Sequence, residues 1–268
     1  MLWLDGVPLE GPAGLDRGLE FGDGLFETIA VRDNRARLLA RHLARLAEGC
    51  ERLGLAAQDA AQLKAEITRA ARIPGIGVLK LILTRGAGGR GYAADPVAPV
   101  RRWLAALSPR ARPARNAIDG VAVQTVVTRL AEQPLLAGLK HLNRLEQVLA
   151  RRELVDPALG EGLMLDTSGR VVCGTMSNVY AVIDDRVVTP ALGRAGVAGV
   201  VRAALLDAWR DDGVEVQVRD LLPDELAAAS EIFLSNALIG VWPVASLDGR
   251  RYVPGPVARR AGAWVESW

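Results

Sequence analysis

Two hydrophobic patterns alternate along the chain. Short apolar runs bounded by Gly, Pro, Asp or Asn are typical of strands, and apolar residues three and four apart are typical of amphipathic helices. Strands are expected at residues 1–4, 7–9, 25–31, 77–85, 103–107, 121–128, 162–165, 179–183 and 231–234. Helices are expected at residues 38–53, 57–72, 143–152, 200–210 and 224–229. This mixture predicts an α+β fold.

A segment rich in proline and arginine divides these elements into two groups. It predicts a small N-terminal domain over residues 1–109, a linker over 110–118 and a larger C-terminal domain over 119–268. A chain of 268 residues is long enough for two domains of ordinary size.

Composition narrows the class of protein. The net charge is +2 without a basic tract, so nucleic-acid binding is not indicated. With two cysteines and two histidines, neither a disulfide framework nor a zinc site is expected. No signal peptide is apparent, and no apolar run approaches the ~20 residues that span a bilayer. We therefore expect a soluble cytoplasmic protein with no membrane partner.

Lysine is scarce beside thirty arginines, and only Lys64, Lys80 and Lys140 carry a primary amine. An aldehyde cofactor needs such an amine, because guanidinium stays protonated and cannot act as a nucleophile. Lys140 precedes a predicted helix in which Asn143 would cap the first turn and Glu146 would reach back. It is therefore the candidate, although a solvated loop lysine fits the same local pattern.

Two features suit an anion. Residues 196–202, Gly-Val-Ala-Gly-Val-Val-Arg, lead into a predicted helix whose N–H groups and positive end would face one point. Arg45 lies on the polar face of the first long helix and could add a bidentate contact. An ordinary turn and a solvated arginine remain the alternatives. The glycine-rich residues 86–92 lack the lysine of a Walker loop.

Several motifs, spread over nearly the whole chain, carry a family resemblance. They are Phe-Gly-Asp-Gly-Leu-Phe at 21–26, Arg-Gly-Ala-Gly-Gly-Arg-Gly-Tyr at 85–92, Leu-Ala-Gly-Leu-Lys-His-Leu-Asn-Arg-Leu-Glu-Gln-Val-Leu at 136–149, the 196–202 segment and Ser-Asn-Ala-Leu-Ile at 235–239. Together they resemble the fold-type IV pyridoxal-phosphate enzymes. The run after Lys140 is most similar to that of the 4-amino-4-deoxychorismate lyases.

The resemblance implies a fold, a cofactor and a reaction. It implies a two-domain fold-type IV enzyme with a small N-terminal α/β domain and a larger C-terminal domain around a β-barrel-like core. Pyridoxal 5'-phosphate would be the cofactor, and the enzyme would be a homodimer acting on a small molecule. The implied reaction converts 4-amino-4-deoxychorismate to 4-aminobenzoate and pyruvate, a step toward folate.

The resemblance also implies roles at matching positions. Lys140 would bind the cofactor covalently and act in catalysis. The other implied cofactor-binding residues are Arg45, Cys173, Asn178, Val200, Val201, Asn236 and Ala237. Substrate contacts are expected at Thr28, Arg90, Tyr92 and Arg110. No residue is expected to bind a metal.

One position departs from the family pattern. Cys173 stands where these enzymes usually carry a glutamate that pairs with the pyridine nitrogen. A thiol is only a weak hydrogen-bond donor and acceptor, so it would stabilise the protonated ring poorly. Either another group pairs with the pyridine nitrogen, or the alignment of this segment with the family pattern is shifted by a residue or so. No acidic residue lies between Asp166 and Asp184, however.

Two other functions stay open on the sequence. A fold-type IV transaminase acting on D- or branched-chain amino acids, or on amines, would use the same lysine and cofactor. A non-catalytic homologue that binds the cofactor without turnover is the second alternative, and Cys173 is compatible with it.

Overall fold

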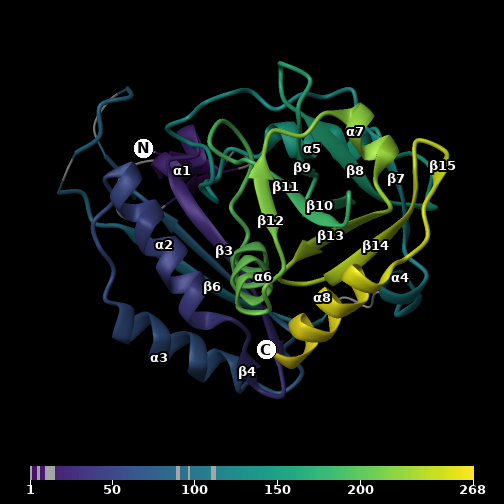
Figure 1. Ribbon diagram of the computed structural model, residues 1–268. Helices are drawn as coiled ribbons and strands as arrows, with labels where there is room; N and C mark the ends of the chain where they lie inside the picture. The colour runs from purple at the N-terminus through teal and green to yellow at the C-terminus, as the bar shows by residue number, and fades with distance from the viewer. Residues whose placement is uncertain (1, 5–6, 10–15, 89–90, 96, 110–112) are drawn as a thin grey trace. The chain divides into compact units, whose positions relative to one another are not determined.

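The computed structural model describes residues 2–4, 7–9, 16–88, 91–95, 97–109 and 113–268 (Figure 1). They form two compact units: Met1–Pro109 with Lys140–Asn143, and Arg110–Leu139 with Arg144–Trp268. Two segments group otherwise than in the sequence-based division: the expected linker at 110–118 groups with the second unit, and Lys140–Asn143 group with the first. Lys140 belongs to the first unit, because the backbone around it is hydrogen-bonded to a strand of that unit.

The first unit is built on a four-stranded antiparallel sheet in the order β4-β3-β5-β6. Its strands are β3 (Gly24–Arg32), β4 (Arg35–Ala36), β5 (Val78–Thr84) and β6 (Arg101–Leu107). Asp33 and Asn34 join β3 to β4 with positive φ angles of 49° and 58°, as a tight hairpin turn requires. A separate pair, β1 (Leu2–Leu4) and β2 (Val7–Leu9), forms a small hairpin.

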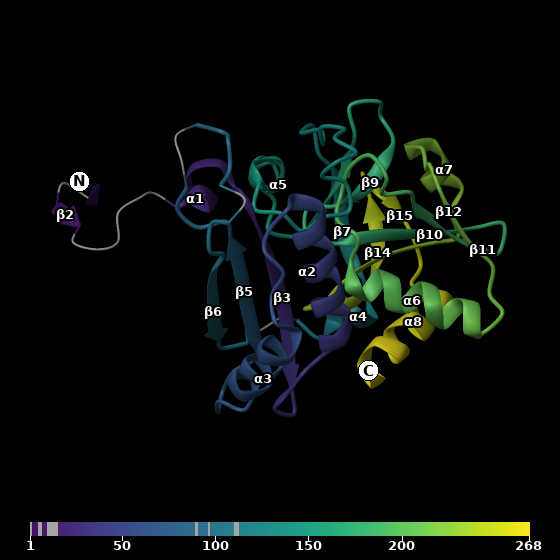
Figure 2. The ribbon, with the colours of Figure 1, turned by 90° about the vertical axis from the view of Figure 1, so that its left-hand side faces the viewer.

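Three helices complete the first unit: α1 (Arg17–Phe21), α2 (Leu39–Leu53) and α3 (Ala60–Ala71). The apolar faces of α2 and α3 pack on the sheet, where buried side chains of β3 and β5 meet them (Figure 2). Gly54 ends α2 with a φ of 62°, and the Asp59 side chain caps α3. Because one face of each of these helices and strands is buried in this core, the spacing of apolar residues in the sequence predicted α2, α3, β3 and β5.

The second unit contains a nine-stranded mixed sheet in the order β12-β11-β10-β13-β14-β7-β8-β9, with β15 paired to β14. The strands are β7 (Val121–Thr125), β8 (Leu159–Leu165), β9 (Val171–Gly174), β10 (Asn178–Ile183), β11 (Arg186–Pro190), β12 (Val216–Arg219), β13 (Glu231–Asn236), β14 (Gly240–Leu247) and β15 (Arg250–Arg251). The sheet curls, because β9 at one end of this path contacts β10 in its middle. The result is the barrel-like core expected from the family.

Helices α4 (Arg115–Ile118), α5 (Leu145–Arg152), α6 (Val200–Asp211), α7 (Pro223–Ala228) and α8 (Pro256–Ser267) belong to the second unit. Helices α6 and α8 lie side by side against β13 and β14 (Figure 1). Helix α4 falls within the expected linker at residues 110–118. Among the described residues, no helix is both long enough and apolar enough to cross a membrane.

Two sequence-based expectations are wrong in detail. Arg144, not Asn143, is the N-cap of α5, and the Asn143 side chain instead donates to the Gly22 carbonyl. Glu146 accepts a hydrogen bond from the Ala131 N–H rather than closing a capping box. The strand expected to reach residue 128 ends at Thr125, because the Glu153 carboxylate accepts the N–H groups of Val127 and Thr128 in place of a neighbouring strand.

Candidate active site

The backbone around Lys140 is hydrogen-bonded to β3. Its carbonyl accepts a hydrogen bond from the Phe26 N–H at 2.9 Å, and the Leu142 N–H donates to the Gly24 carbonyl at 3.0 Å. The half-buried Lys140 side chain places Nζ 4.2 Å from the centroid of the Phe26 ring. The backbone of this lysine is therefore held by a strand, unlike that of a mobile loop lysine.

The other two lysines lie in different surroundings. Lys80 is exposed on β5, and its Nζ is 5.7 Å from the Phe26 ring centroid. Lys64 is exposed on α3. Thr28, an expected substrate residue, pairs with Lys80 across the sheet and lies on the same face of β3 as Phe26. Lys140 and Thr28 are thus brought to one face of β3.

The remaining substrate residues are only partly described. Tyr92 is 86% exposed, and its ring contacts the edge of Phe21 at a centroid distance of 5.3 Å. Arg90 and Arg110 lie outside the described residues.

Arg45 is part of a buried charged cluster. Its Nε donates to Glu27 Oε1 at 2.7 Å, and its Nη2 contacts Glu27 Oε2. His42 Nδ1 lies 2.7 Å from the same carboxylate. Burial alone would raise the pKa of Glu27, but hydrogen bonds and charge from His42 and Arg45 outweigh it and lower the pKa. Arg45 is therefore oriented by a buried anion.

Sequence reasoning missed Glu27 and His42, although a signal was present. Glu27 occupies an inward position of β3 between the buried Leu25 and Ile29, where alternation predicts an apolar side chain. A charged residue on a core face has to be paired, so Glu27 pointed to a buried cationic partner.

The first turn of α6 is fixed from behind by Asn178. Its amide donates to the Val197 carbonyl at 2.9 Å. Gly199 is the N-cap residue, and a Cβ there would overlap Asn178 Oδ1. Val200 and Val201 begin the helix with buried apolar side chains. The polar groups that they contribute to this helix end are therefore their backbone N–H groups. Such an end favours an anion.

The turn after β13 follows a strand that pairs with β10 (Asn178–Ile183). Asn236 ends β13, which pairs with the strand that Asn178 begins. Its carboxamide donates to the Met176 carbonyl at 3.0 Å and accepts two backbone N–H groups, of residues 238 and 239, at 2.8 Å each. Asn236 therefore shapes the turn that contains Ala237.

Cys173 lies on β9 and is 7% exposed. Burial, reinforced by the negative charges of Glu161 and Glu146, raises the pKa of its thiol to about 12, while the positive charge of Arg144 opposes the shift. At neutral pH this side chain is a neutral thiol. It cannot supply the negative charge that the usual glutamate supplies.

Near Cys173, the buried carboxylate of Glu161 organises the turn between β9 and β10. It accepts hydrogen bonds from the Ser177 hydroxyl at 2.8 Å, the Met176 N–H at 3.3 Å and the Thr175 hydroxyl. Arg151 lies 3.6 Å from the same carboxylate. Sequence reasoning missed Glu161 for the same reason as Glu27, since both are carboxylates on buried strand faces.

The first unit holds an amine next to β3 and an arginine oriented by a buried carboxylate, and the second unit holds the N-terminal end of α6 and the turn shaped by Asn236. This set suits a small molecule that carries both an aldehyde and a phosphate. In the described part of the chain, no three His, Cys, Asp or Glu side chains are grouped so as to hold a metal ion.

The chain is similar to known proteins over nearly its whole length. The chain is 34% identical to an aminodeoxychorismate lyase of Vibrio harveyi over 92% of each chain. It resembles the crystal structure of 4-amino-4-deoxychorismate lyase from Pseudomonas aeruginosa, with 50% identity, a TM-score of 0.91, and 99% of this chain and 98% of that chain covered. A pyridoxal-phosphate-bound hypothetical aminotransferase from Mycobacterium tuberculosis matches with 26% identity, a TM-score of 0.81, and 99% and 94% coverage.

These structures confirm the expected α+β fold of the fold-type IV enzymes. A family model described as amino-transferase class IV matches residues 24–247. That match covers most of the chain, and the chain therefore belongs to the class IV amino-transferase family.

Proposed function

We propose that this protein is a pyridoxal-phosphate-dependent lyase that converts 4-amino-4-deoxychorismate to 4-aminobenzoate and pyruvate. Its similarity to two lyases of that name supports the reaction. The geometric observation that carries the proposal is the amine of Lys140, 4.2 Å from the Phe26 ring and anchored through its backbone to β3. Catalysis by a lysine depends on such fixed placement.

The residues present fit pyridoxal 5'-phosphate. The end of α6 offers backbone N–H groups at Val200 and Val201, and the absence of a side chain on Gly199 lets Asn178 pack closely against this helix end. We assign the phosphate to this helix end, to the turn at Asn236 and Ala237, and to Arg45. These groups match the charge and hydrogen-bonding capacity of a phosphate.

The catalytic proton transfers fall to Lys140. When bound, pyridoxal phosphate supplies a conjugated ring that accepts electrons from the amine-bearing carbon of the substrate. The neutral Nζ of Lys140 takes the proton from that carbon as a general base. The bond from the substrate ring to the enolpyruvyl oxygen breaks, and Nζ returns the proton to the departing enolpyruvate, which becomes pyruvate. Thr28 lies on the same face of β3 and is placed to contact the substrate.

Cys173 favours elimination over transamination. A neutral thiol at the pyridine nitrogen gives the ring little help in accepting electrons. Elimination produces an aromatic ring, which supplies driving force that transamination lacks. A weak electron sink is therefore tolerable in a lyase and costly in a transaminase.

Transaminase activity is the second candidate function. The family match and the similarity to an aminotransferase of Mycobacterium tuberculosis favour it. Such an enzyme needs a keto acid for its second half-reaction, whereas the lyase needs none. A non-catalytic homologue would bind the cofactor and form no product from either kind of substrate.

Product analysis separates these functions. Holoenzyme is incubated with 4-amino-4-deoxychorismate, and 4-aminobenzoate and pyruvate are measured without a keto acid. The lyase predicts equal amounts of the two products. Robust transfer of an amino group to a keto acid, with no 4-aminobenzoate, would assign the protein as a transaminase instead.

We also propose a homodimer. Helix α5 carries Leu145, Val148 and Leu149 with 76%, 53% and 50% of their surface exposed. Their spacing of three and four residues puts them on one face of the helix. A second copy of the chain covering this apolar face would remove it from water. Sedimentation of wild-type protein and of Leu145→Glu tests the proposal, because a charge at the interface should shift the protein to monomers.

A further inference from the structure

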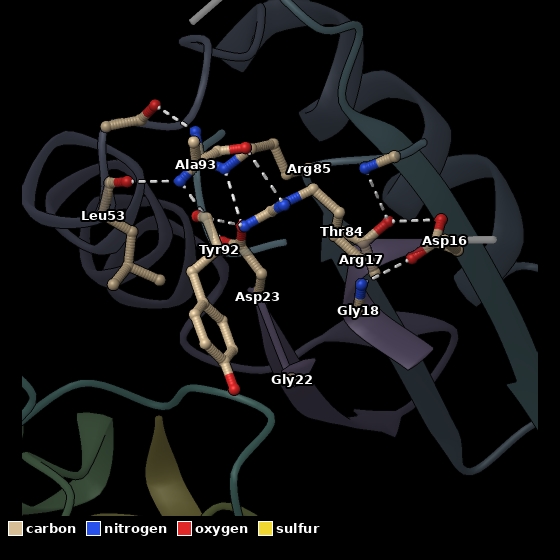
Figure 3. Close-up of polar contacts among 12 residues, drawn as sticks. Asp16, Arg17, Gly18, Gly22, Asp23, Leu53, Thr84, Arg85, Tyr92 and Ala93 are labelled. Carbon is tan, nitrogen blue, oxygen red and sulfur yellow. Dashed lines mark hydrogen bonds and ion pairs between the residues drawn. The ribbon is translucent and has the colours of Figure 1, made fainter. Parts of the chain in front are cut away.

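Two of the sequence motifs, at residues 21–26 and 85–92, interlock through a single carboxylate. Asp23 Oδ2 accepts hydrogen bonds from Arg17 Nε at 3.0 Å and Arg85 Nε at 2.8 Å, and Arg85 Nη2 lies 3.2 Å from Oδ1 (Figure 3). Arg17 is 4% exposed and Arg85 8%. Two buried guanidinium groups thus share one carboxylate, which fixes the orientation of both.

Arg17 uses the rest of its guanidinium to hold the segment that contains Tyr92. Its Nη1 donates to the Gly91 carbonyl at 3.0 Å, and its Nη2 donates to the Tyr92 carbonyl at 2.9 Å. Arg85 is engaged differently, through the Leu53 and Gly54 carbonyls at the end of α2. Asp23, Arg17 and Arg85 are called the hub below. The segment with Tyr92 is therefore attached to the hub through Arg17.

The Tyr92 side chain is exposed and does not pack into a hydrophobic core. The ring points away from the paired charges (Figure 3), and among the described residues the ring that it contacts is that of Phe21. It remains 86% exposed while its carbonyl is held by a buried arginine. An ordered backbone carrying an exposed phenol suits ligand contact better than packing, because the phenol O–H can donate to an anionic oxygen.

Residues 22–26, which include Asp23, also contact the segment Lys140–Asn143. Gly24 pairs with Leu142, and Phe26 pairs with Lys140. A Cβ on Gly22 would come within 2.5 Å of Asn143, so these backbones approach too closely for a larger residue. Residues 22–26 therefore contact Lys140–Asn143 on one side and, through Asp23, the Tyr92 segment on the other.

We propose that Asp23 is a positioning residue that acts through Arg17 to set Tyr92, whose phenol hydrogen-bonds a carboxylate of the substrate. The proposal deepens the lyase assignment and rests on it for the identity of the substrate. It also explains why both motifs occur in one chain, since each supplies half of the hub. Removing the Asp23 charge should weaken substrate binding while leaving Lys140 in place.

A double-mutant cycle tests the coupling on the holoenzyme. Asp23→Asn and Tyr92→Phe should each raise KM on the order of tenfold, the loss of one charge-assisted hydrogen bond, and change kcat by less than about threefold. The double variant should have the KM of Tyr92→Phe alone, because Asp23 acts through Tyr92. Multiplicative KM effects, or a loss confined to kcat, would overturn the proposal.

A second readout needs neither substrate nor cofactor. The chain has three tyrosines, so 3-fluorotyrosine labelling gives three ¹⁹F signals, and Tyr92→Phe identifies that of Tyr92. In apo protein, Asp23→Asn and Arg17→Lys should each narrow the Tyr92 signal and shift it toward the free amino acid. The signals of Tyr180 and Tyr252 should stay in place, which verifies folding.

Asp16→Asn is the matched control. The Asp16 side chain accepts hydrogen bonds from the Gly18 N–H and the Thr84 hydroxyl beside the hub, and neither of these donors belongs to the residues 91–93 that Arg17 holds. It should leave the Tyr92 signal and KM unchanged. An unchanged Tyr92 signal in both hub variants refutes the positioning role, whatever the reaction. A wild-type enzyme that forms no 4-aminobenzoate refutes the lyase assignment instead.

Discussion

Burial, reinforced by the negative charge of Glu161, keeps the Cys173 thiol protonated and raises its pKa to about 12. A glutamate introduced there would lie near Glu161 and could pair with the pyridine nitrogen. Cys173→Glu should raise transamination more than elimination, because only transamination depends wholly on the ring as electron acceptor. Rates with a keto acid and with 4-amino-4-deoxychorismate are compared at measured cofactor occupancy.

Cys173→Ser is the control for that substitution, since a hydroxyl is similar in size and also neutral. It should change the ratio of the two activities by less than about threefold. An equal rise of both activities in Cys173→Glu would contradict the account of this residue. Lost cofactor would instead point to a pocket too small for glutamate.

Arg45 gives a prediction for cofactor affinity. Glu27 orients its guanidinium, so a charge-assisted contact to phosphate should form with little reorganisation. Arg45→Ala should weaken binding of pyridoxal phosphate to apo protein by about one to two orders of magnitude. Fluorescence titration measures this. Arg52→Ala on the same helix should bind normally, and equal affinities for all three proteins would make Arg45 a structural residue only.

At the residue scale, sequence reasoning found the groups with distinctive chemistry and missed those that orient them. Lys140 could be singled out because amines are scarce, and the helix end near Val200 because of its glycines. Glu27 and Glu161 were overlooked although each is a charged residue on a buried strand face, whereas Arg17 could not be singled out, because its importance comes from a partner distant in sequence. Arg17 meets the Tyr92 carbonyl 75 residues away.

At the scale of elements, the start of α6 depends on close packing between a glycine and an asparagine. Gly199→Ala should push Asn178 aside and weaken binding of pyridoxal phosphate to apo protein, because the added methyl overlaps Oδ1. The backbone φ at this position is −67°, so alanine adds no conformational strain. Adding Asn178→Ala should recover part of the affinity by making room for the methyl.

Asn178→Ala alone is the reference for this pair. It frees the Val197 carbonyl and should cost roughly 1 kcal/mol of binding or stability. A double variant that binds worse than the product of the two single effects would show that the contact between Gly199 and Asn178 does not govern this helix end.

Elements with a regular pattern were predictable, and those fixed by tertiary contacts were not. Helix α2 was expected within a residue of its bounds, because leucine spacing and Gly54 mark it. The capping box predicted at α5 is wrong, because the Asn143 side chain donates a hydrogen bond to the Gly22 carbonyl instead. Strand β14 and helix α8 escaped the sequence analysis, although both pack in the second unit.

At the scale of the whole molecule, the buried carboxylate of Glu27 and the partly buried carboxylate of Asp23 tie the stability of the first unit to pH. Burial alone would raise the pKa values of Asp23 and Glu27, but their arginine and histidine partners outweigh it and lower both. Their stabilisation is therefore present above the ordinary pKa values of 3.8 and 4.5, and it is lost as pH falls through the lower folded-state values.

Glu27→Gln should accordingly reduce the free energy of unfolding at pH 7, and its difference from wild type should shrink as the pH falls below about 4. Urea unfolding at a series of pH values measures both quantities. A difference that stays constant down to pH 2 would mean that the Glu27 carboxylate is not ionised in the folded protein at neutral pH.

The central claim is that Lys140, among three lysines, binds the cofactor. The measurement is borohydride reduction of the holoenzyme followed by mass spectrometry of its peptides. Lys80 is the internal control, because its amine lies 5.7 Å from the same Phe26 ring that Lys140 approaches to 4.2 Å. The account predicts the reduced cofactor on the Lys140 peptide, with no label there in Lys140→Ala. Label on Lys80 or Lys64 in the wild-type enzyme would contradict it.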